Sequence, residues 1–163
     1  MSRFLITGLP RSRTAWWAVI TGALHEPISR RGRLWPWHDD EGVSDSGAAM
    51  HLDEILDLLA PRTLIVERPR AEVLASAWAY LAPLKLTDKE AFSRLLDHAS
   101  ANLDAARSPL IKRVAYRDLG DIDTVRACLD WLGVAEPRHL EQLLHMNIQS
   151  DLDWNLAQLR RAA

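Results

Sequence analysis

Three short runs of mainly apolar residues have the length and composition of buried β-strands. The first two are residues 3–7 (RFLIT) and 63–67 (TLIVE), and residues 110–115 form a third candidate. In the first two runs the apolar residues follow one another instead of alternating with polar ones, which is typical of strands covered on both faces. The pattern therefore predicts a parallel sheet between two layers of helices.

Segments with helical signals lie between these strands. Thr87 and Glu90 have the spacing of a capping box, and Asp121 and Gly133 can cap the two ends of another helix. Strands that alternate with helices predict an α/β fold, with a three-layer parallel sheet in a single domain over residues 1–163. The predicted helices are residues 14–24, 49–59, 70–81, 87–106, 122–132, 136–146 and 151–161.

Residues 25–48 break the alternation because they are rich in Pro, Gly, Ser, Trp and charged residues. We expect a long excursion of loop and short elements there, and long loops are often functional. Trp35 and Trp37 in this stretch either cover an acceptor, stack on a nucleobase or close a small core. Residues 38–59 contain seven acidic residues and no Lys or Arg, which we interpret as solvated surface.

The overall composition excludes several classes of protein. The chain has 163 residues and a net charge of −2, so we expect no nucleic-acid binding through bulk charge. The single cysteine, Cys128, excludes an internal disulfide framework and a cysteine-based zinc site, and it favours a reducing, cytoplasmic location. No apolar run approaches the roughly 18 residues of a membrane span, so we expect no membrane partner. The sequence leaves the oligomeric state open.

The sequence GLPRSRT, which begins at Gly8, joins the first predicted strand to the first predicted helix. The backbone N–H groups of a first helical turn have no partner within the helix, so they attract anions. Gly8 allows a tight turn, and Arg11 and Arg13 can form forked hydrogen bonds to phosphate or sulfate oxygens. Ser12 and Thr14 add hydroxyl groups. The loop lacks the second glycine and the lysine of the nucleotide-binding signature G-x-x-x-x-G-K-[ST].

This loop and the AWW that follows it resemble the 5′-phosphosulfate loop of the sulfotransferases, written P-[KR]-S-G-T-[TS]-W. Arg13 stands where most members have glycine, and it either narrows the loop or adds an anion contact. The matching positions are Pro10, Arg11, Ser12, Thr14 and Trp16.

A second segment is also similar to this family. Sulfotransferases follow a strand with R-[DN]-P-x-[DE]-x-x-x-S, whose Arg and Ser hold the 3′-phosphate of the donor. Arg68 and Ser76 keep this spacing of eight residues. Glu72 also falls in place, whereas Pro69 stands one position early. A third stretch, residues 116–134, resembles an architectural Y-x-D-L … L-G-v part of the family.

The resemblance implies a P-loop-type fold and the donor 3′-phosphoadenosine 5′-phosphosulfate, with adenosine 3′,5′-bisphosphate as product and no metal ion. The acceptor is expected to be an unidentified hydroxyl or amine of a small molecule or carbohydrate. Many members clamp the donor with an R-K-G element that is missing here, so either Arg113, Arg117 or Arg138 replaces it or the donor binds more weakly. The residues expected to bind the donor are Gly8, Pro10, Arg11, Ser12, Arg13, Thr14, Ala15, Trp16, Arg68 and Ser76.

Arg11 is the expected electrostatic catalyst, because a guanidinium stabilises the transferring group without giving up its proton. The general base is expected just after the first predicted helix, where the family places an acceptor-side segment. Glu26 is the first choice and His25 the second. Weaker candidates are His38, Asp39 and His51.

Two other functions stay open. The chain can be an ATP-dependent P-loop kinase that uses Mg²⁺, although the missing Gly-Lys-[ST] argues against it. It can also be a catalytically inactive nucleotide-binding or interaction protein. The departures at Arg13 and Pro69 and the missing R-K-G element keep this alternative open.

Overall fold

The computed structural model describes residues 3–28, 42–81 and 88–146. Five strands in these ranges form one sheet in the order β2-β3-β1-β4-β5, and every neighbouring pair is parallel. The predicted α/β class with a parallel sheet is therefore confirmed. The strands are β1 (Phe4–Gly8), β2 (Leu24–His25), β3 (Gly42–Ser44), β4 (Arg62–Glu67) and β5 (Ile111–Ala115).

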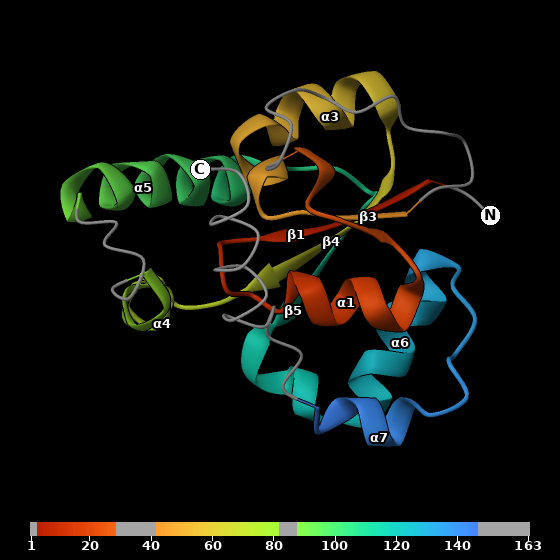
Figure 1. Ribbon diagram of the computed structural model, residues 1–163. Coiled ribbons are helices and arrows are strands. Elements are labelled where there is room, and N and C mark those ends of the chain that lie inside the picture. The colour runs from red at the N-terminus through yellow and green to blue at the C-terminus, as the bar shows by residue number, and fades with distance from the viewer. Residues whose placement is uncertain (1–2, 29–41, 82–87, 147–163) are drawn as a thin grey trace, which may run out of the picture.

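Helices cover both faces of the sheet (Figure 1). One face carries α1 (Thr14–Thr21), α6 (Ile122–Leu132) and α7 (Leu140–Leu144). The opposite face carries the 3₁₀-helix η1 (Gly47–His51), α3 (Leu52–Leu59) and α5 (Lys89–Ala105). Helix α4 (Arg70–Leu81) follows β4 and packs against α5, and the 3₁₀-helix η3 (Tyr116–Gly120) follows β5.

Successive residues of β1 enter two separate cores. Phe4 and Ile6 join the core beneath α1, α6 and α7, whereas Leu5 joins the core beneath α3 and α5. Side chains of neighbouring strand residues point to opposite faces, so a strand covered on both faces needs an uninterrupted apolar run. Trp16 and Trp17 of α1 are both buried in the first core. Because β1 is covered on both faces, its apolar residues follow one another without alternation, which is the pattern that predicted the sheet.

The stretch predicted as loop and short elements supplies one edge of the sheet. Strand β3 pairs with β1, and β2 pairs with β3 at the edge. These strands have three and two residues, too few for a recognisable periodicity. Trp35, Trp37, His38 and Asp39, together with the predicted helix over residues 151–161, lie outside the described residues.

Several helix ends differ from the prediction. The first helix ends at Thr21 instead of residue 24, because Gly22 adopts a left-handed backbone with φ of 71°. Helix α5 is capped by Asp88, one residue after the expected Thr87, and the Asp88 carboxylate accepts a hydrogen bond from the Ala91 N–H at 2.8 Å. The helix predicted over residues 136–146 is limited to α7.

The helix predicted between Asp121 and Gly133 is confirmed as α6. The Asp121 carboxylate accepts a hydrogen bond from the Thr124 N–H, and Gly133 ends the helix with a left-handed φ of 72°. The Thr124 hydroxyl also donates a hydrogen bond to this carboxylate, and the hydrogen bonds from the hydroxyl and then from the N–H lower the pKa of Asp121 below its ordinary value. Both signals act locally, which is why the sequence alone was sufficient to find them.

The chain reverses its direction of winding at β1. After β1 it runs through α1 to β2 and β3 on one side, and then through α3 on the opposite face to β4 on the other side. Figure 1 shows these two connections on opposite faces of the sheet. In open α/β sheets such a switch opens a crevice beyond the carboxyl end of the central strand, where ligands bind. The loop after Gly8 lies at this position.

Within the described residues, no helix has both the length and the apolar character needed to cross a bilayer.

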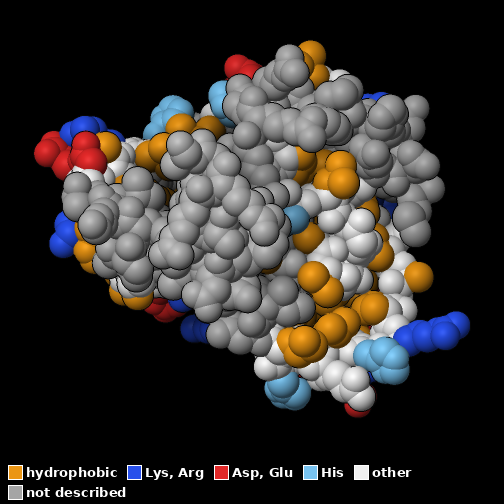
Figure 2. All heavy atoms as spheres, viewed as in Figure 1, with side chains coloured by type: hydrophobic (Ala, Val, Ile, Leu, Met, Phe, Trp, Pro, Cys, Tyr) orange, Lys and Arg blue, Asp and Glu red, His pale blue; other side chains and the backbone are white. Residues whose placement is uncertain are grey.

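Figure 2 shows hydrophobic side chains gathered over α1 and α7 on one face of the molecule. Val19 in α1 and Met146, just after α7, are 54% and 52% exposed.

Candidate anion-binding site

The loop between β1 and α1 is held tightly to the sheet at its first residue. A Cβ atom on Gly8 would lie 2.5 Å from the carbonyl oxygen of Val66 in β4, so only glycine allows this approach. On the other side, the Thr7 hydroxyl donates a hydrogen bond of 2.8 Å to the Asp45 carbonyl. The loop therefore starts from a point fixed to both neighbouring strands.

Two residues of the loop have a left-handed backbone, although neither is glycine. The φ angle is 68° at Arg11 and 63° at Arg13, and Ser12 lies between them. Turns of this kind direct successive backbone N–H groups into a shared concavity that attracts anions. Left-handed φ is unfavourable for residues with a Cβ atom. This conformation explains why glycine suits the position of Arg13 in the motif that the loop resembles.

The Ser12 hydroxyl is buried in this loop without a hydrogen-bond partner. Ser12 is 0% exposed, and its Oγ atom has no donor or acceptor within reach among the described residues. Helix α1 starts two residues later, and its N-cap residue, Arg13, makes no side-chain capping hydrogen bond. Buried hydroxyls are nearly always hydrogen-bonded in folded proteins. An unpaired hydroxyl beside an uncapped helix start suits a bound anion.

The second predicted segment reaches the loop from β4 and α4. The Arg68 guanidinium donates a hydrogen bond to the Arg11 carbonyl at 2.5 Å. The Arg11 Nε–H donates a hydrogen bond to the Ser76 Oγ atom, with 3.4 Å between the two heavy atoms. Arg68 also forms an ion pair with Glu72, with 3.5 Å between Nε and Oε2. The structure thus brings Arg11, Arg68 and Ser76 together at the carboxyl end of the sheet.

Arg13 contacts the protein on the side of η3. Its Nη1 atom donates a hydrogen bond of 3.3 Å to the Leu119 carbonyl. Its guanidinium carbon lies 5.2 Å from the centre of the Trp16 ring and 5.6 Å from that of Tyr116. These distances correspond to cation–π contacts with both rings.

The two candidate bases lie on the other side of the loop, where His25 ends β2 and Glu26 follows it. The Glu26 Oε1 atom accepts hydrogen bonds from the hydroxyls of Thr14 and Ser46, at 3.4 and 3.3 Å. The His25 Nε2 atom lies 3.7 Å from the same oxygen. Glu26 is therefore linked directly to the start of α1. His51, a weaker candidate, is exposed and pairs with Glu54 on the surface.

Asp45 corrects the interpretation of the acidic segment as solvated surface. It follows β3, is 0% exposed, and its carboxylate accepts hydrogen bonds from the backbone N–H groups of Ile28 and Gly47, at 2.5 and 2.7 Å. A buried carboxylate needs such donors to offset the loss of solvation. Sequence reasoning missed this residue because β3 was not recognised, so nothing marked Asp45 as the end of a strand.

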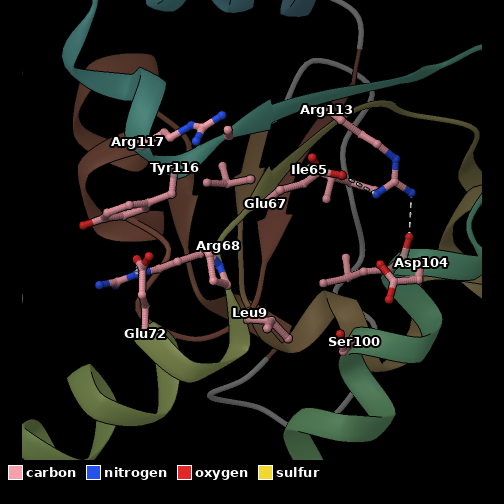
Figure 3. A pocket seen from close by; sticks show the side chains of 14 residues that line it. Leu9, Ile65, Glu67, Arg68, Glu72, Ser100, Asp104, Arg113, Tyr116 and Arg117 are labelled. Carbon is pink, nitrogen blue, oxygen red and sulfur yellow. Dashed lines mark hydrogen bonds and ion pairs between the residues drawn. The ribbon is translucent and has the colours of Figure 1, made fainter.

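A cavity of about 400 Å³ lies beside the loop, at the carboxyl ends of β4 and β5 (Figure 3). Its lining combines apolar side chains, including Leu9, Ile65 and Leu103, with charged ones from β4, α4, α5 and η3. In Figure 3 the Tyr116 ring and the Arg68 side chain lie next to each other at one end of this cavity. An apolar floor with polar groups around it is typical of a small-molecule site.

The three basic residues considered as replacements for an R-K-G clamp have different surroundings. Arg113 donates hydrogen bonds to Glu67 at 3.0 Å and to the carbonyls of Leu103 and Ala106, and so holds the end of α5 to the sheet. Arg117 lines the cavity, and its side chain is 89% exposed. Arg138 is exposed and does not line this cavity. Arg117 has the position that best suits a ligand contact.

Neither the family models nor the curated proteins with which the sequence was compared contain a match to this chain. No group of three or more potential metal-ligating side chains occurs among the described residues. The site is therefore defined by its own geometry. It consists of an anion-suited loop, two arginines and a serine on the β4 side, and two carboxylates on the β3 side.

Proposed function

We propose that this chain is a P-loop-type, sulfotransferase-like protein that transfers a sulfuryl group from 3′-phosphoadenosine 5′-phosphosulfate to a hydroxyl or amine acceptor. The observation that carries the proposal is the meeting of the two motifs. Arg68 and Ser76 contact Arg11 of the loop, although 57 and 65 residues separate them from it along the chain. In the resembled family these motifs hold the two phosphate-bearing ends of one donor, so their contact supports a shared ligand.

The residues at the site fit such a donor. The unpaired Ser12 hydroxyl and the backbone N–H groups around it suit the oxygens of a phosphosulfate. Arg68 and Ser76 are candidates to hold a 3′-phosphate, and the cavity beside Arg68 has room and an apolar floor for a nucleoside. When bound, the donor supplies an activated sulfuryl group.

The chain's own residues divide the remaining work. Arg11 stabilises negative charge on the transferring group and on the bridging oxygen, and it keeps its proton throughout. Glu26 accepts the proton of the acceptor as general base. Thr14 and Ser46 donate hydrogen bonds to its Oε1 atom, which orients the carboxylate at the start of α1. Transfer of this kind depends mainly on positioning and electrostatic stabilisation.

One observation favours the kinase alternative. Asp45 follows β3, and the neighbouring Ser44 hydroxyl donates a hydrogen bond of 2.8 Å to the Thr14 carbonyl, so an acidic residue lies close to the loop threonine. In P-loop nucleotide hydrolases a loop Ser or Thr and an Asp hold Mg²⁺. Here both carboxylate oxygens of Asp45 accept backbone hydrogen bonds, which makes this residue a poor ligand.

Isothermal titration calorimetry with adenosine 3′,5′-bisphosphate, AMP and ATP–Mg²⁺ tests the proposal. We expect the bisphosphate to bind most tightly, because it alone carries a 3′-phosphate for Arg68. Equal binding of the bisphosphate and AMP would contradict the assignment of Arg68 and Ser76. Preferential binding of ATP–Mg²⁺ would replace the proposal with the kinase.

The variant Arg68→Ala should weaken binding of the bisphosphate by roughly 10- to 100-fold, the range for hydrogen bonds to charged groups. Arg70→Ala is the matched control. Arg70 lies two residues away, but its guanidinium contacts Asp97 and Ser93 of α5. We expect this control to bind the bisphosphate as the unchanged protein does, and thermal unfolding of both variants checks that they are folded.

A further inference from the structure

Tyr116 lies between the two motifs of the proposed site, although neither motif contains it. It is the first residue of η3, directly after β5. The guanidinium carbon of Arg68 lies 4.1 Å from the centre of its ring, and that of Arg13 lies 5.6 Å from it. Figure 3 shows the Tyr116 ring beside the Arg68 side chain. Tyr116 therefore contacts one cation from the loop and one from the end of β4.

The same two arginines are the ones that hold the loop backbone. Arg68 donates a hydrogen bond to the carbonyl of Arg11, and Arg13 donates one to the carbonyl of Leu119 in η3. Arg11 and Arg13 are also the two loop residues with left-handed φ. Residues other than glycine keep such a conformation only when their surroundings fix it. The ring of Tyr116 contacts both of these arginine side chains.

We propose that Tyr116 is a positioning residue of the anion-binding loop. Its ring holds Arg13 and Arg68 by cation–π contacts, and through them it keeps Arg11 and Arg13 in the left-handed conformation that shapes the concavity. Glycine would adopt the left-handed conformation at position 13 without strain. In this protein, contacts of the Arg13 side chain stabilise that conformation instead. The inference rests on the proposed function only in taking the loop as an anion site, and it makes no assumption about the transfer reaction.

Backbone amide hydrogen exchange of residues 9–15 in the ligand-free protein tests this role without any nucleotide. Tyr116→Leu should speed exchange in the loop roughly 2- to 30-fold, which corresponds to the usual range of cation–π energies. Tyr116→Phe keeps the ring and should leave the exchange rates of the loop amides unchanged. Equal exchange in Tyr116→Leu and the unchanged protein would overturn the proposal.

The Arg13→Gly background separates positioning from general packing. Glycine adopts a φ near 63° without strain, so loop exchange should depend less on Tyr116 in this background. If Tyr116→Leu speeds exchange equally with Arg or Gly at position 13, the ring does not act through Arg13 and the proposal fails. Arg13→Gln gives a second test in case Tyr116→Leu does not fold, because it removes the cation and keeps the backbone strain. Loop exchange in Arg13→Gln must also rise.

Trp131→Leu provides a matched control. Trp131 contacts the Arg62 guanidinium at 6.0 Å, and Arg62 begins β4 at the end of the sheet opposite the loop. This variant removes an aromatic ring from a cation–π contact far from the loop and should not alter loop exchange. A rise there would mean that loss of any such ring loosens the whole molecule, and the proposal would fall.

A titration with inorganic sulfate shows whether the positioning matters for binding. Tyr116→Leu should weaken sulfate binding, and Tyr116→Phe should not. Unchanged sulfate affinity in Tyr116→Leu would contradict the proposed link between ring and anion site. Failure of adenosine 3′,5′-bisphosphate to bind, together with the expected changes in exchange and sulfate affinity, would overturn the proposed function and leave the role of Tyr116 standing.

Discussion

The two sides of the loop between β1 and α1 carry opposite charge. On the β4 side, the guanidinium groups of Arg11 and Arg68 lie together with the Ser76 hydroxyl. On the β3 side, the carboxylates of Glu26 and Asp45 lie among serine and threonine hydroxyls and backbone N–H groups. The first side attracts an anion more strongly than the second, although Glu72 forms an ion pair with Arg68 there. This separation suits a reaction in which an anionic donor and a proton acceptor must both approach one loop.

The two sides also differ in how they are held in place. On the β4 side, positively charged side chains donate to backbone carbonyls and contact an aromatic ring. On the β3 side, a buried carboxylate accepts from backbone N–H groups of two separate segments. The candidate ligand contacts on the first side are side-chain groups of Arg11, Arg68 and Ser76, whereas the second side contains the buried carboxylate of Asp45. Substitutions on the two sides should therefore affect different measurements.

The largest effect is expected for Glu26→Gln, measured as turnover with a sulfuryl acceptor once one is identified. Loss of a general base lowers rates by roughly 10²- to 10⁴-fold. The affinity for adenosine 3′,5′-bisphosphate should not change, because Glu26 lies on the side away from Arg68. Glu54→Gln, an exposed carboxylate paired with His51, serves as control. Normal turnover in Glu26→Gln would show that another residue is the general base. His25 would then be the next candidate.

A smaller effect is expected on stability when Asp45 is changed to Ala. The backbone N–H groups of Ile28 and Gly47 then lose their acceptor, so the free energy of unfolding should fall by roughly 2–4 kcal/mol. Urea denaturation measures this change. Asp57→Ala, an exposed acid on α3, is the control and should have little effect. If the free energy of unfolding falls by a similar amount in the two variants, Asp45 contributes no more to stability than an exposed acid does.

The smallest effect comes from a pair of serines, one on each side of the loop. Ser76→Ala should weaken binding of adenosine 3′,5′-bisphosphate by roughly 2- to 10-fold, as expected for one neutral hydrogen bond. Ser46→Ala should leave this affinity unchanged, since its hydroxyl contacts Glu26. Calorimetric titration of both variants provides the comparison. If Ser46→Ala weakens binding of the bisphosphate as much as Ser76→Ala does, the bisphosphate does not bind preferentially on the β4 side.

The parts of the fold that the sequence predicted well are those with local signals. Strands β1 and β4 have long apolar runs because both of their faces are covered, and α6 has a cap at each end. Strand β3 has three residues, and it exists because β1 provides a partner for it. No window of the sequence contains that information.

The candidate site divides in the same way. The proximity of Arg68 and Ser76 to the loop could be anticipated, because each follows a strand or lies on the helix after it at a recognisable spacing. The burial of Asp45 could not, since it depends on the unrecognised β3. The direction of Arg13 could not either, because its hydrogen-bond partner, Leu119, is 106 residues away. Tertiary contacts of this kind leave no local trace in the sequence.

The order of the strands has a consequence for the behaviour of the protein in concentrated solution. Within residues 3–28, 42–81 and 88–146, the sheet ends at β2 on one side and at β5 on the other. Strand β2 has two residues, and β5 carries Lys112 and Arg113 in its middle. Short edge strands and charged residues on an edge both discourage pairing with a strand from another molecule. The chain thus places its uninterrupted apolar strands, β1 and β4, where no foreign strand can add to them.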